Sequence, residues 1–216
     1  MGDPIRLTDL PLRDLADRLA SRDPVPGGGS AAAIAGAMGA ALVSMVVELT
    51  VGRPEYAEHE AALREIGAGA VERRAVLLDL AEADAAAYGS VVTARRMPKQ
   101  TDPEREARSA ALRDAMLQAA GVPLRTATVA SEVLELAERI APIGNSNAVS
   151  DAGVAAQLAA AALRGALLNV RINLPYLPED EPLRLTAIAE MRRLETSAAA
   201  SERATLSAVD ARMGLV

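Results

Sequence analysis

The chain has almost no aromatic side chains with which to fill a protein core. Its 216 residues include no Phe and no Trp, and Tyr56, Tyr88 and Tyr176 are its only aromatic residues. Half of the residues are apolar all the same, with alanine and leucine the most frequent, and these two favour helices over strands. We therefore predict an all-α fold in which small residues let neighbouring helices approach closely.

Proline- and glycine-rich segments interrupt the chain at wide intervals, and the stretches between them have helical periodicity. No linker is long or polar enough to divide the chain, so we predict one domain over residues 1–216, a bundle of long Ala-rich helices. We predict that Ser30 caps the second helix and that Pro123, which lacks an N–H, kinks or breaks the fourth. The predicted helices cover residues 9–20, 30–51, 55–96, 104–140 with an interruption at 121–123, 149–172, and a last stretch after residue 180.

The uncharged segment 31–47 is the candidate for a membrane span. It is short for a bilayer and rich in Ala and Gly, which are weakly hydrophobic. We interpret it as a helix buried on all sides, with Gly36, Gly39 and Ala40 forming a small-residue face. The start of the chain has no apolar core of the signal-peptide kind, so we expect a soluble, cytoplasmic protein with no membrane partner.

Charge and metal-ligating residues argue against several classes of function. The net charge is −6 and no basic block is present, which argues against nucleic-acid binding. The absence of Cys removes disulfides and a thiol nucleophile. The single histidine, His59, argues against a zinc site, so we predict no metal.

Asp84 falls on a helical face that is otherwise apolar. Leu77, Leu80, Asp84, Tyr88 and Val91 follow one another at intervals of three or four residues, which places them on one side of a helix. Desolvation on such a face raises the pKa of a carboxyl group toward the range useful for general acid–base catalysis. The alternatives are a structural ion pair with an arginine, or a helix turned so that Asp84 faces solvent.

A glycine-rich segment, Gly27, Gly28, Gly29 and Ser30, precedes the second helix. Free N–H groups at a helix N-terminus attract anions and carbonyl oxygens. The segment lacks the Gly-Lys of a Walker loop and follows no predicted strand. The alternative is a turn that leads into a tightly packed helix.

Polar residues also stand at both ends of the fifth predicted helix. Asn145, Asn147 and Asp151 surround its start, where capping and dipole complementarity are equally good explanations. Asn169 and Asn173 lie one turn apart near its end, and two amides there can match the donors and acceptors of a heterocycle. Their alternative role is to satisfy backbone groups at the helix end.

Basic residues gather around the loop between the third and fourth predicted helices. They are Arg95, Arg96, Lys99 and Arg108. A solvated surface is one explanation, and a site for the anionic tail of a ligand is the other.

Seven of these features occur in one order along the chain. They are Asp23-Pro-Val-Pro-Gly-Gly-Gly-Ser-Ala-Ala-Ala, Asp84-Ala-Ala-Ala-Tyr88, Met97-Pro-Lys-Gln-Thr, Arg108, Val122-Pro-Leu, Gly144-Asn-Ser-Asn-Ala-Val-Ser-Asp151 and Asn169-Val-Arg-Ile-Asn173-Leu. As an ordered set they resemble the cyclodeaminase domain of the formiminotransferase–cyclodeaminase family, which also contains stand-alone methenyltetrahydrofolate cyclohydrolases. The resemblance extends from the first helix to about Leu174.

The resemblance implies an all-α homodimeric enzyme of folate one-carbon metabolism. It implies closure of 5-formiminotetrahydrofolate to 5,10-methenyltetrahydrofolate with loss of ammonia, or alternatively hydrolysis of the methenyl ring to 10-formyltetrahydrofolate. The implied partner is a tetrahydrofolate derivative, including its polyglutamylated forms, with no further cofactor. No segment resembles the formiminotransferase domain, so a transferase activity is not expected. A non-catalytic folate-binding bundle is the rival interpretation.

The resemblance also suggests roles for the matching residues. Asp84 is the expected acid/base, and Asp151 is the expected second carboxylate, which orients Asp84 or the pterin. Lys99 and Arg108 are expected to hold the glutamyl tail. The residues expected to line the pterin pocket are Gly27, Gly28, Gly29, Ser30, Asn145, Asn147, Asn169 and Asn173.

Overall fold

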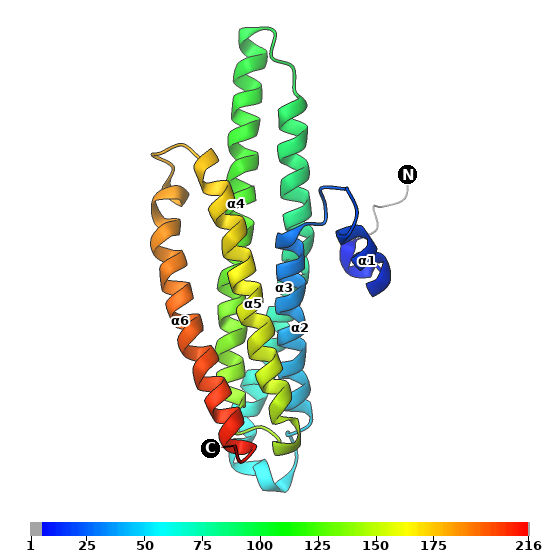
Figure 1. The fold of residues 1–216 in the computed structure, drawn as a ribbon, viewed down its shortest axis with the longest axis vertical. Coiled ribbons are helices and arrows are strands. Elements are labelled where there is room, and N and C mark those ends of the chain that lie inside the picture. The colour runs from blue at the N-terminus through cyan, green and yellow to red at the C-terminus, as the bar shows by residue number, and fades with distance from the viewer. Residues whose placement is uncertain (1–5, 216) are drawn as a thin grey trace.

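The computed structural model describes residues 6–215, and no β-strand occurs within that range. The predicted all-α bundle is confirmed (Figure 1). Short 3₁₀ turns precede or follow several of the helices. The helices are α1 (Leu12–Leu19), α2 (Gly28–Glu48), α3 (Glu60–Arg96), α4 (Asp102–Ile140), α5 (Val149–Asn173) and α6 (Pro182–Arg212).

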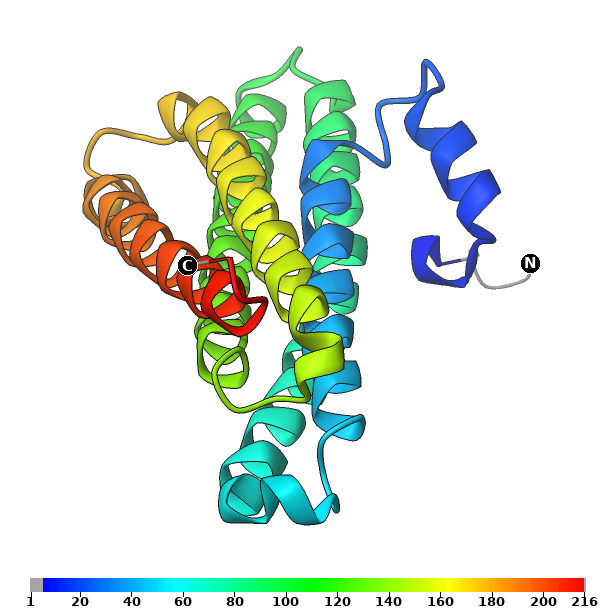
Figure 2. The same ribbon diagram turned by 60° about the horizontal axis from the view of Figure 1, so that its bottom comes forward.

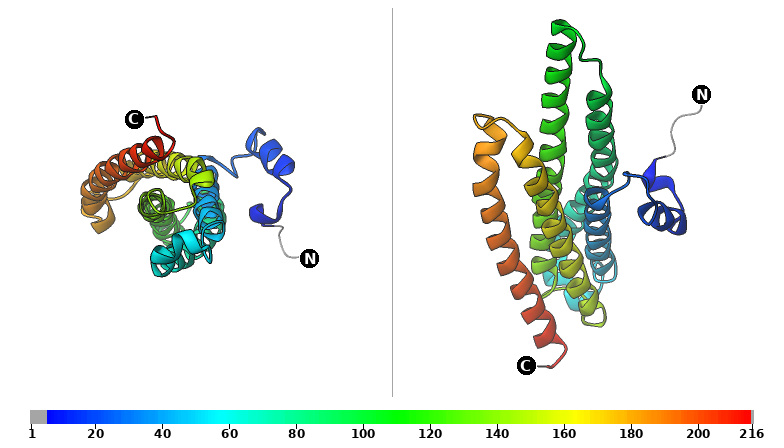
Figure 3. Two further views of the ribbon diagram at one scale, coloured as in Figure 1. Left: turned by 90° about the horizontal axis from the view of Figure 1, so that it is seen from below. Right: turned by 45° about the horizontal axis from the view of Figure 1, so that its top comes forward.

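Helix α4 lies at the centre of the bundle. It packs against α2, α3, α5 and α6, and the end-on view in Figure 3 shows these four helices curving around it. The hairpin of α3 and α4 extends beyond the N-terminal end of α2, where the C-terminal end of α5 also lies (Figure 1). Helix α1 stands to the side of the bundle (Figure 2). The first turn of α2 therefore points toward a space bordered by α3, α4 and α5.

Small residues bring α2 and α5 into close contact, as the sequence predicts. A Cβ added to Gly39 would lie 2.9 Å from the carbonyl oxygen of Ala155, so only glycine allows this approach. A Cβ at Gly36 would lie 3.2 Å from the Cβ of Ala162. The prediction that α2 is buried on all sides is wrong for a single chain, because Met38 on its outer face is 52% exposed.

Within residues 6–215, two helical segments are long and apolar enough to cross a membrane by length and composition, Gly28–Glu48 and Ser146–Tyr176. In each segment, 56% of the apolar 18-residue stretch is buried inside the bundle. Their apolarity is therefore explained mainly by packing against other helices.

The predicted cap at Ser30 and the predicted interruption of the fourth helix at residues 121–123 are both wrong. Helix α2 begins at Gly28, so Ser30 lies inside its first turn and its hydroxyl contacts α3 instead of capping. Helix α4 runs through Pro123 without interruption from Asp102 to Ile140. The carbonyl oxygen that Pro123 leaves without an N–H partner is that of Ala119, and it accepts a hydrogen bond from Asn173 Nδ2 at 2.7 Å.

Candidate active site

A pocket of about 360 Å³ occupies the space in front of the α2 N-terminus. Its walls come from the segment before α2, the middle of α3, α4, and the C-terminal end of α5. Its volume lies in the range of small-molecule sites. The polar side chains that line it are Asp84, Tyr88, Arg95, Asn169, Asn173 and Tyr176.

Asp84 lies directly against the first turn of α2. Its Oδ2 is 3.0 Å from the hydroxyl of Ser30, and that hydroxyl is also 2.9 Å from the carbonyl oxygen of Ala81. A Cβ at Gly29 would fall 2.1 Å from Asp84 Oδ1, so the carboxylate occupies the place of a side chain at that position. Glycine at position 29 is therefore a requirement for the contact between α2 and Asp84.

The pKa of Asp84 is raised above its ordinary value of 3.8. Desolvation is the largest cause, and hydrogen bonds from the Ser30 side chain and backbone oppose it. No ion pair includes Asp84 within residues 6–215, and the side chain is only partly accessible. Both alternatives, the structural ion pair and the solvent-facing carboxylate, are thereby contradicted.

The Ser30 hydroxyl can partner Asp84 in either protonation state. When Asp84 is ionised, the hydroxyl donates its proton to the carboxylate. When Asp84 is protonated, it donates to Ser30 Oγ, which then donates to the Ala81 carbonyl oxygen. A group that remains hydrogen-bonded on gaining or losing a proton is suited to acid–base chemistry.

Two asparagines of α5 also line the pocket. Asn169 Nδ2 donates to the carbonyl oxygen of Gly165 at 2.9 Å, which leaves its Oδ1 and one N–H for other partners. A Cβ at Gly28 would lie 3.6 Å from Asn169 Nδ2, so the start of α2 also touches this amide. Asn173 lines the same pocket one turn further along α5.

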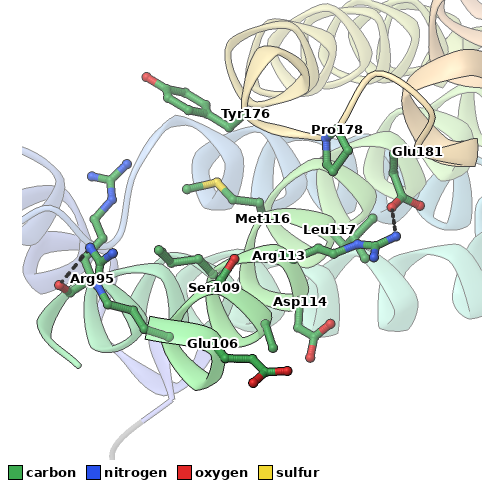
Figure 4. Close-up of a pocket in the computed structure, with 13 residues that line it drawn as sticks. Arg95, Glu106, Ser109, Arg113, Asp114, Met116, Leu117, Tyr176, Pro178 and Glu181 are labelled. Atoms are coloured by element: carbon green, nitrogen blue, oxygen red, sulfur yellow. Dashed lines mark hydrogen bonds and ion pairs between the residues drawn. The ribbon is translucent and has the colours of Figure 1, made fainter. Parts of the chain in front are cut away.

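A larger cleft of about 1170 Å³ adjoins this pocket and shares three lining residues with it, Arg95, Met116 and Tyr176. Figure 4 shows Arg95 at one end and the Arg113–Glu181 pair, 2.9 Å apart, at the other, with Met116 between them. Arg108 also lines the cleft, and its Nη2 donates to the Arg95 carbonyl oxygen at 3.4 Å.

The cleft offers two guanidinium groups that make no ion pair within residues 6–215, those of Arg95 and Arg108. The Nε of Arg108 is buried without a hydrogen-bond partner. Lys99 is exposed on the loop after α3 and lines neither the pocket nor the cleft. Lys99 and Arg108, which are predicted to hold one ligand tail together, therefore do not line a common cavity, and only Arg108 lines the cleft.

Three predicted site residues lie at the other end of the bundle. Asn145 is buried, receives the N–H of Asn147 on its Oδ1, and donates from Nδ2 to the carbonyl oxygen of Leu49 at 2.9 Å. Asp151 lies in the first turn of α5, eighteen residues before Asn169 and thus about 27 Å from it along the helix. The prediction that Asn145, Asn147 and Asp151 share the pocket of Asp84 is wrong within one chain.

The pocket also contains residues that the sequence did not single out as site residues. Those residues are Tyr88, Tyr176 and Met116, whereas Arg95, which connects the pocket to the cleft, belongs to the basic cluster that the sequence indicated. The composition could have drawn attention to the two tyrosines, because aromatic residues are so few in this chain. Two of the chain's three aromatic residues thus line one pocket, where an aromatic ring can stack against a planar ligand.

The fold and the pocket together define the class of this protein. It is an all-α bundle whose pocket, at the N-terminal end of α2, holds one desolvated carboxyl group suited to acid–base chemistry and two side-chain amides. The chain belongs to the formiminotransferase-cyclodeaminase family, whose profile it matches over residues 11–193.

Individual relatives match over nearly the same region. The chain is 44% identical to a methenyltetrahydrofolate cyclohydrolase of Methylorubrum extorquens over 191 residues, which cover 88% of this chain and 89% of the relative. It is 36% identical to the formimidoyltransferase-cyclodeaminase of Mus musculus over 174 residues, 81% of this chain but 32% of that longer protein. The crystal structure of a formiminotetrahydrofolate cyclodeaminase from Thermotoga maritima superposes with a TM-score of 0.85 at 29% identity, covering 96% of this chain and 100% of that one.

Proposed function

We propose that the protein is an enzyme of folate one-carbon metabolism that forms or opens the 5,10-methenyl bridge of tetrahydrofolate. The observation that carries this proposal is Asp84, a desolvated carboxyl group with a raised pKa at the first turn of α2. Both reactions pass through a tetrahedral carbon between two nitrogens and require proton transfers. A single carboxyl group that gains and loses a proton supplies them, so we propose no cofactor beyond the folate itself.

In ring closure, N10 attacks the formimino carbon carried on N5. Asp84 protonates the departing nitrogen, the C–N bond to it breaks, and ammonia leaves. The proton that Asp84 delivers is the one it first takes from N10, so the protonated formimino group gives the methenyl cation and neutral ammonia, and the Asp84 carboxylate is regenerated. In ring opening, water attacks the methenyl carbon while Asp84 takes a proton from it. The C–N5 bond then breaks as Asp84 passes that proton to N5 and the hydroxyl proton leaves to solvent, so the formyl group remains on N10.

Of the two reactions, ring opening has the stronger support. The relative that matches this chain over nearly its whole length at 44% identity is named a cyclohydrolase. Cyclodeaminase activity is supported by the Thermotoga maritima structure at 29% identity and is the second candidate. A non-catalytic folate-binding bundle has less support, because Asp84 and its Ser30 partner are both in place.

The pocket and the cleft together match the parts of a folate. We propose that the pterin lies in the pocket against Asp84, Asn169 and Asn173. The aromatic middle of the molecule then passes between Met116 and Tyr176 into the cleft. The carboxylates of the glutamyl tail are bound by Arg95 and Arg108, whose guanidinium groups lack an ion-pair partner.

We further propose that the enzyme is a cytoplasmic homodimer that pairs through α5. Seven α5 positions repeat at intervals of three and four residues, as in a coiled coil, and none of them is buried. The two nearby arginines, Arg164 and Arg171, pair with Glu202 and Glu195 of α6 and so add no free charge to this face. The seven positions are Asp151, Val154, Leu158, Ala161, Gly165, Leu168 and Ile172.

This face is self-complementary when a second copy is turned by half a rotation about an axis perpendicular to α5 near Ala161. Leu158 then lies opposite the partner's Gly165, and Val154 opposite the partner's Leu168. The same rotation sets the partner's Asp151 beside Ile172, which lines the pocket. The dimer would thereby bring the partner's Asp151 close to Asp84, although these two residues lie at opposite ends of the bundle within one chain.

The test is an assay of the purified protein with 5-formiminotetrahydrofolate and with 5,10-methenyltetrahydrofolate, following the methenyl absorbance. Gain of absorbance with the first substrate identifies a cyclodeaminase, and accelerated loss with the second identifies a cyclohydrolase. The spontaneous hydrolysis rate without enzyme and the Asp84→Asn variant serve as controls. No turnover of either substrate by a folded preparation would contradict the proposal.

A further inference from the structure

Asn173 is held by two carbonyl oxygens. Its Nδ2 donates to Ala119 O of α4 at 2.7 Å and to Asn169 O of its own helix at 2.9 Å. A side-chain amide nitrogen carries two hydrogens, and here both are directed at acceptors. The orientation of the amide is therefore determined by chemistry, because a flipped amide would set its oxygen against two other oxygens.

The Ala119 carbonyl oxygen is available because of a proline. Ala119 lies four residues before Pro123, and in an unbroken α-helix its carbonyl oxygen would accept the N–H of residue 123. Proline has no N–H, so this carbonyl remains open inside a helix that is otherwise continuous over 39 residues. Pro123 is itself buried in the bundle.

With its nitrogen bound on both sides, Asn173 has only Oδ1 left for a hydrogen bond to a ligand in the pocket that it lines. No donor within residues 6–215 hydrogen-bonds to this oxygen, and Asn173, Ala119 and Asp84 line one pocket. Asn169 differs, since its Nδ2 uses one N–H on the Gly165 carbonyl oxygen and retains the other. The pocket thus contains one fixed acceptor and one adaptable amide.

We propose that Pro123 is a positioning residue. By leaving the Ala119 carbonyl oxygen open, it orients Asn173 so that Oδ1 accepts an N–H of the ligand. Resting on the proposed function, that donor is an N–H of the reduced pterin ring. The proline removes one hydrogen bond of α4 and so weakens the helix locally. In exchange, the Asn173 amide is held in the orientation in which Oδ1 is the acceptor.

The test compares Pro123→Ala with Pro103→Ala. Pro103 lies in the first turn of the same helix, where a missing N–H removes no helical bond. Alanine at 123 restores an N–H that competes for the Ala119 carbonyl oxygen. We expect Pro123→Ala to weaken tetrahydrofolate binding by about 3- to 30-fold, as for a lost hydrogen bond, and to leave the melting temperature equal or higher. Pro103→Ala should bind as the original protein does.

The double variant with Asn173→Ala separates positioning from packing. If Pro123 acts through Asn173, Pro123→Ala has no further effect on the dissociation constant in the Asn173→Ala background. An equal loss of affinity in both backgrounds, or a loss accompanied by a lower melting temperature, would overturn the proposal.

Hydrogen exchange of the Asn173 side-chain amide, followed by NMR on the ligand-free protein, provides a readout that does not depend on folate. We expect slow exchange in the original protein and in Pro103→Ala, and fast exchange in Pro123→Ala. Unchanged exchange in Pro123→Ala would overturn the proposed role of the proline. If the exchange rates are as expected but the protein binds no tetrahydrofolate, the proposed function is refuted. The role of Pro123 in orienting Asn173 is then still supported.

Discussion

Ser30 Oγ lies 3.0 Å from Asp84 Oδ2, although the two residues are 54 positions apart in the chain. The contact joins the first turn of α2 to the middle of α3. It leaves the carboxyl group desolvated but hydrogen-bonded, and the raised pKa of Asp84 follows from that balance. Several predictions about activity, stability and assembly depend on it or on the surfaces around it.

Asp84→Asn should abolish most of the activity without weakening the fold. The amide keeps the size and an acceptor for Ser30 but carries no titratable proton, so turnover should fall about 10²–10⁴-fold. The melting temperature should stay the same or rise, because a desolvated charge is removed and no ion pair is broken. Calorimetry and turnover on one preparation check both. A less stable but fully active variant would contradict the catalytic assignment.

The stability of the protein should depend on the protonation of Asp84 with a defined sign. Because its pKa is raised above 3.8 by folding, the folded state binds more protons than the unfolded state just above that pH. The free energy of unfolding should therefore decrease as pH rises from 3.8 through the folded pKa, relative to Asp84→Asn. Urea unfolding of both proteins between pH 4 and pH 7 measures this difference. A difference that grows more favourable to the original protein with rising pH would contradict it.

Gly29→Ala should disable the site by displacing Asp84. The new Cβ would fall 2.1 Å from Asp84 Oδ1, and either the carboxyl group or the start of α2 must move. Displacements of about 1 Å at a reacting group lower rates about 100-fold, so kcat/KM should fall by 10- to 100-fold. Gly89→Ala is the matched control, since a Cβ there meets nothing within 4 Å and alanine favours the helix. Equal activity of both variants would show that the contact is not needed.

Arg108→Ala should weaken the binding of polyglutamylated folates more than it slows the chemical step. The guanidinium group lines the cleft away from Asp84 and has no carboxylate partner, so its loss should raise KM by about 3- to 30-fold with kcat nearly kept. Lys99→Ala is the control, because Lys99 lies outside both cavities. Titration with mono- and polyglutamyl forms compares the two. An equal rise of KM in both variants would contradict this assignment and would indicate that Lys99 also binds the glutamyl tail.

Ala161→Glu should convert a dimer to monomers and reduce activity. The substitution sets like charges against each other at the proposed twofold axis of α5. Light scattering should give about twice the chain mass of 22.4 kDa for the original protein and the chain mass for the variant. Ala199→Glu, at an exposed position of α6, should leave the mass unchanged. A monomeric original protein with full activity would contradict both the dimer and the shared Asp151.

The positions of Asp151 and Pro123 illustrate what sequence reasoning could not reach. Asp151 and Asn169 belong to one predicted helix, and eighteen positions along that helix separate the two by about 27 Å. Their membership of one ordered motif set suggested a common pocket, which one chain does not form. Pro123 was expected to kink or break α4, because the rule for proline in a helix considers the bond that is lost. It does not consider a distant amide that can use the freed carbonyl oxygen.

The sequence by itself determined the helices, their approximate ends and the face on which Asp84 lies. These properties depend on residues three or four positions apart, and helical periodicity records them directly. Only the tertiary structure decided that Gly29, Asp84 and Asn173 meet and that Asp84 and Asp151 lie at opposite ends of the bundle. Which helix ends come together depends on the directions of the helices and on how closely small residues let them pack. Those distances are set by contacts between segments far apart in the chain, and no local pattern contains them.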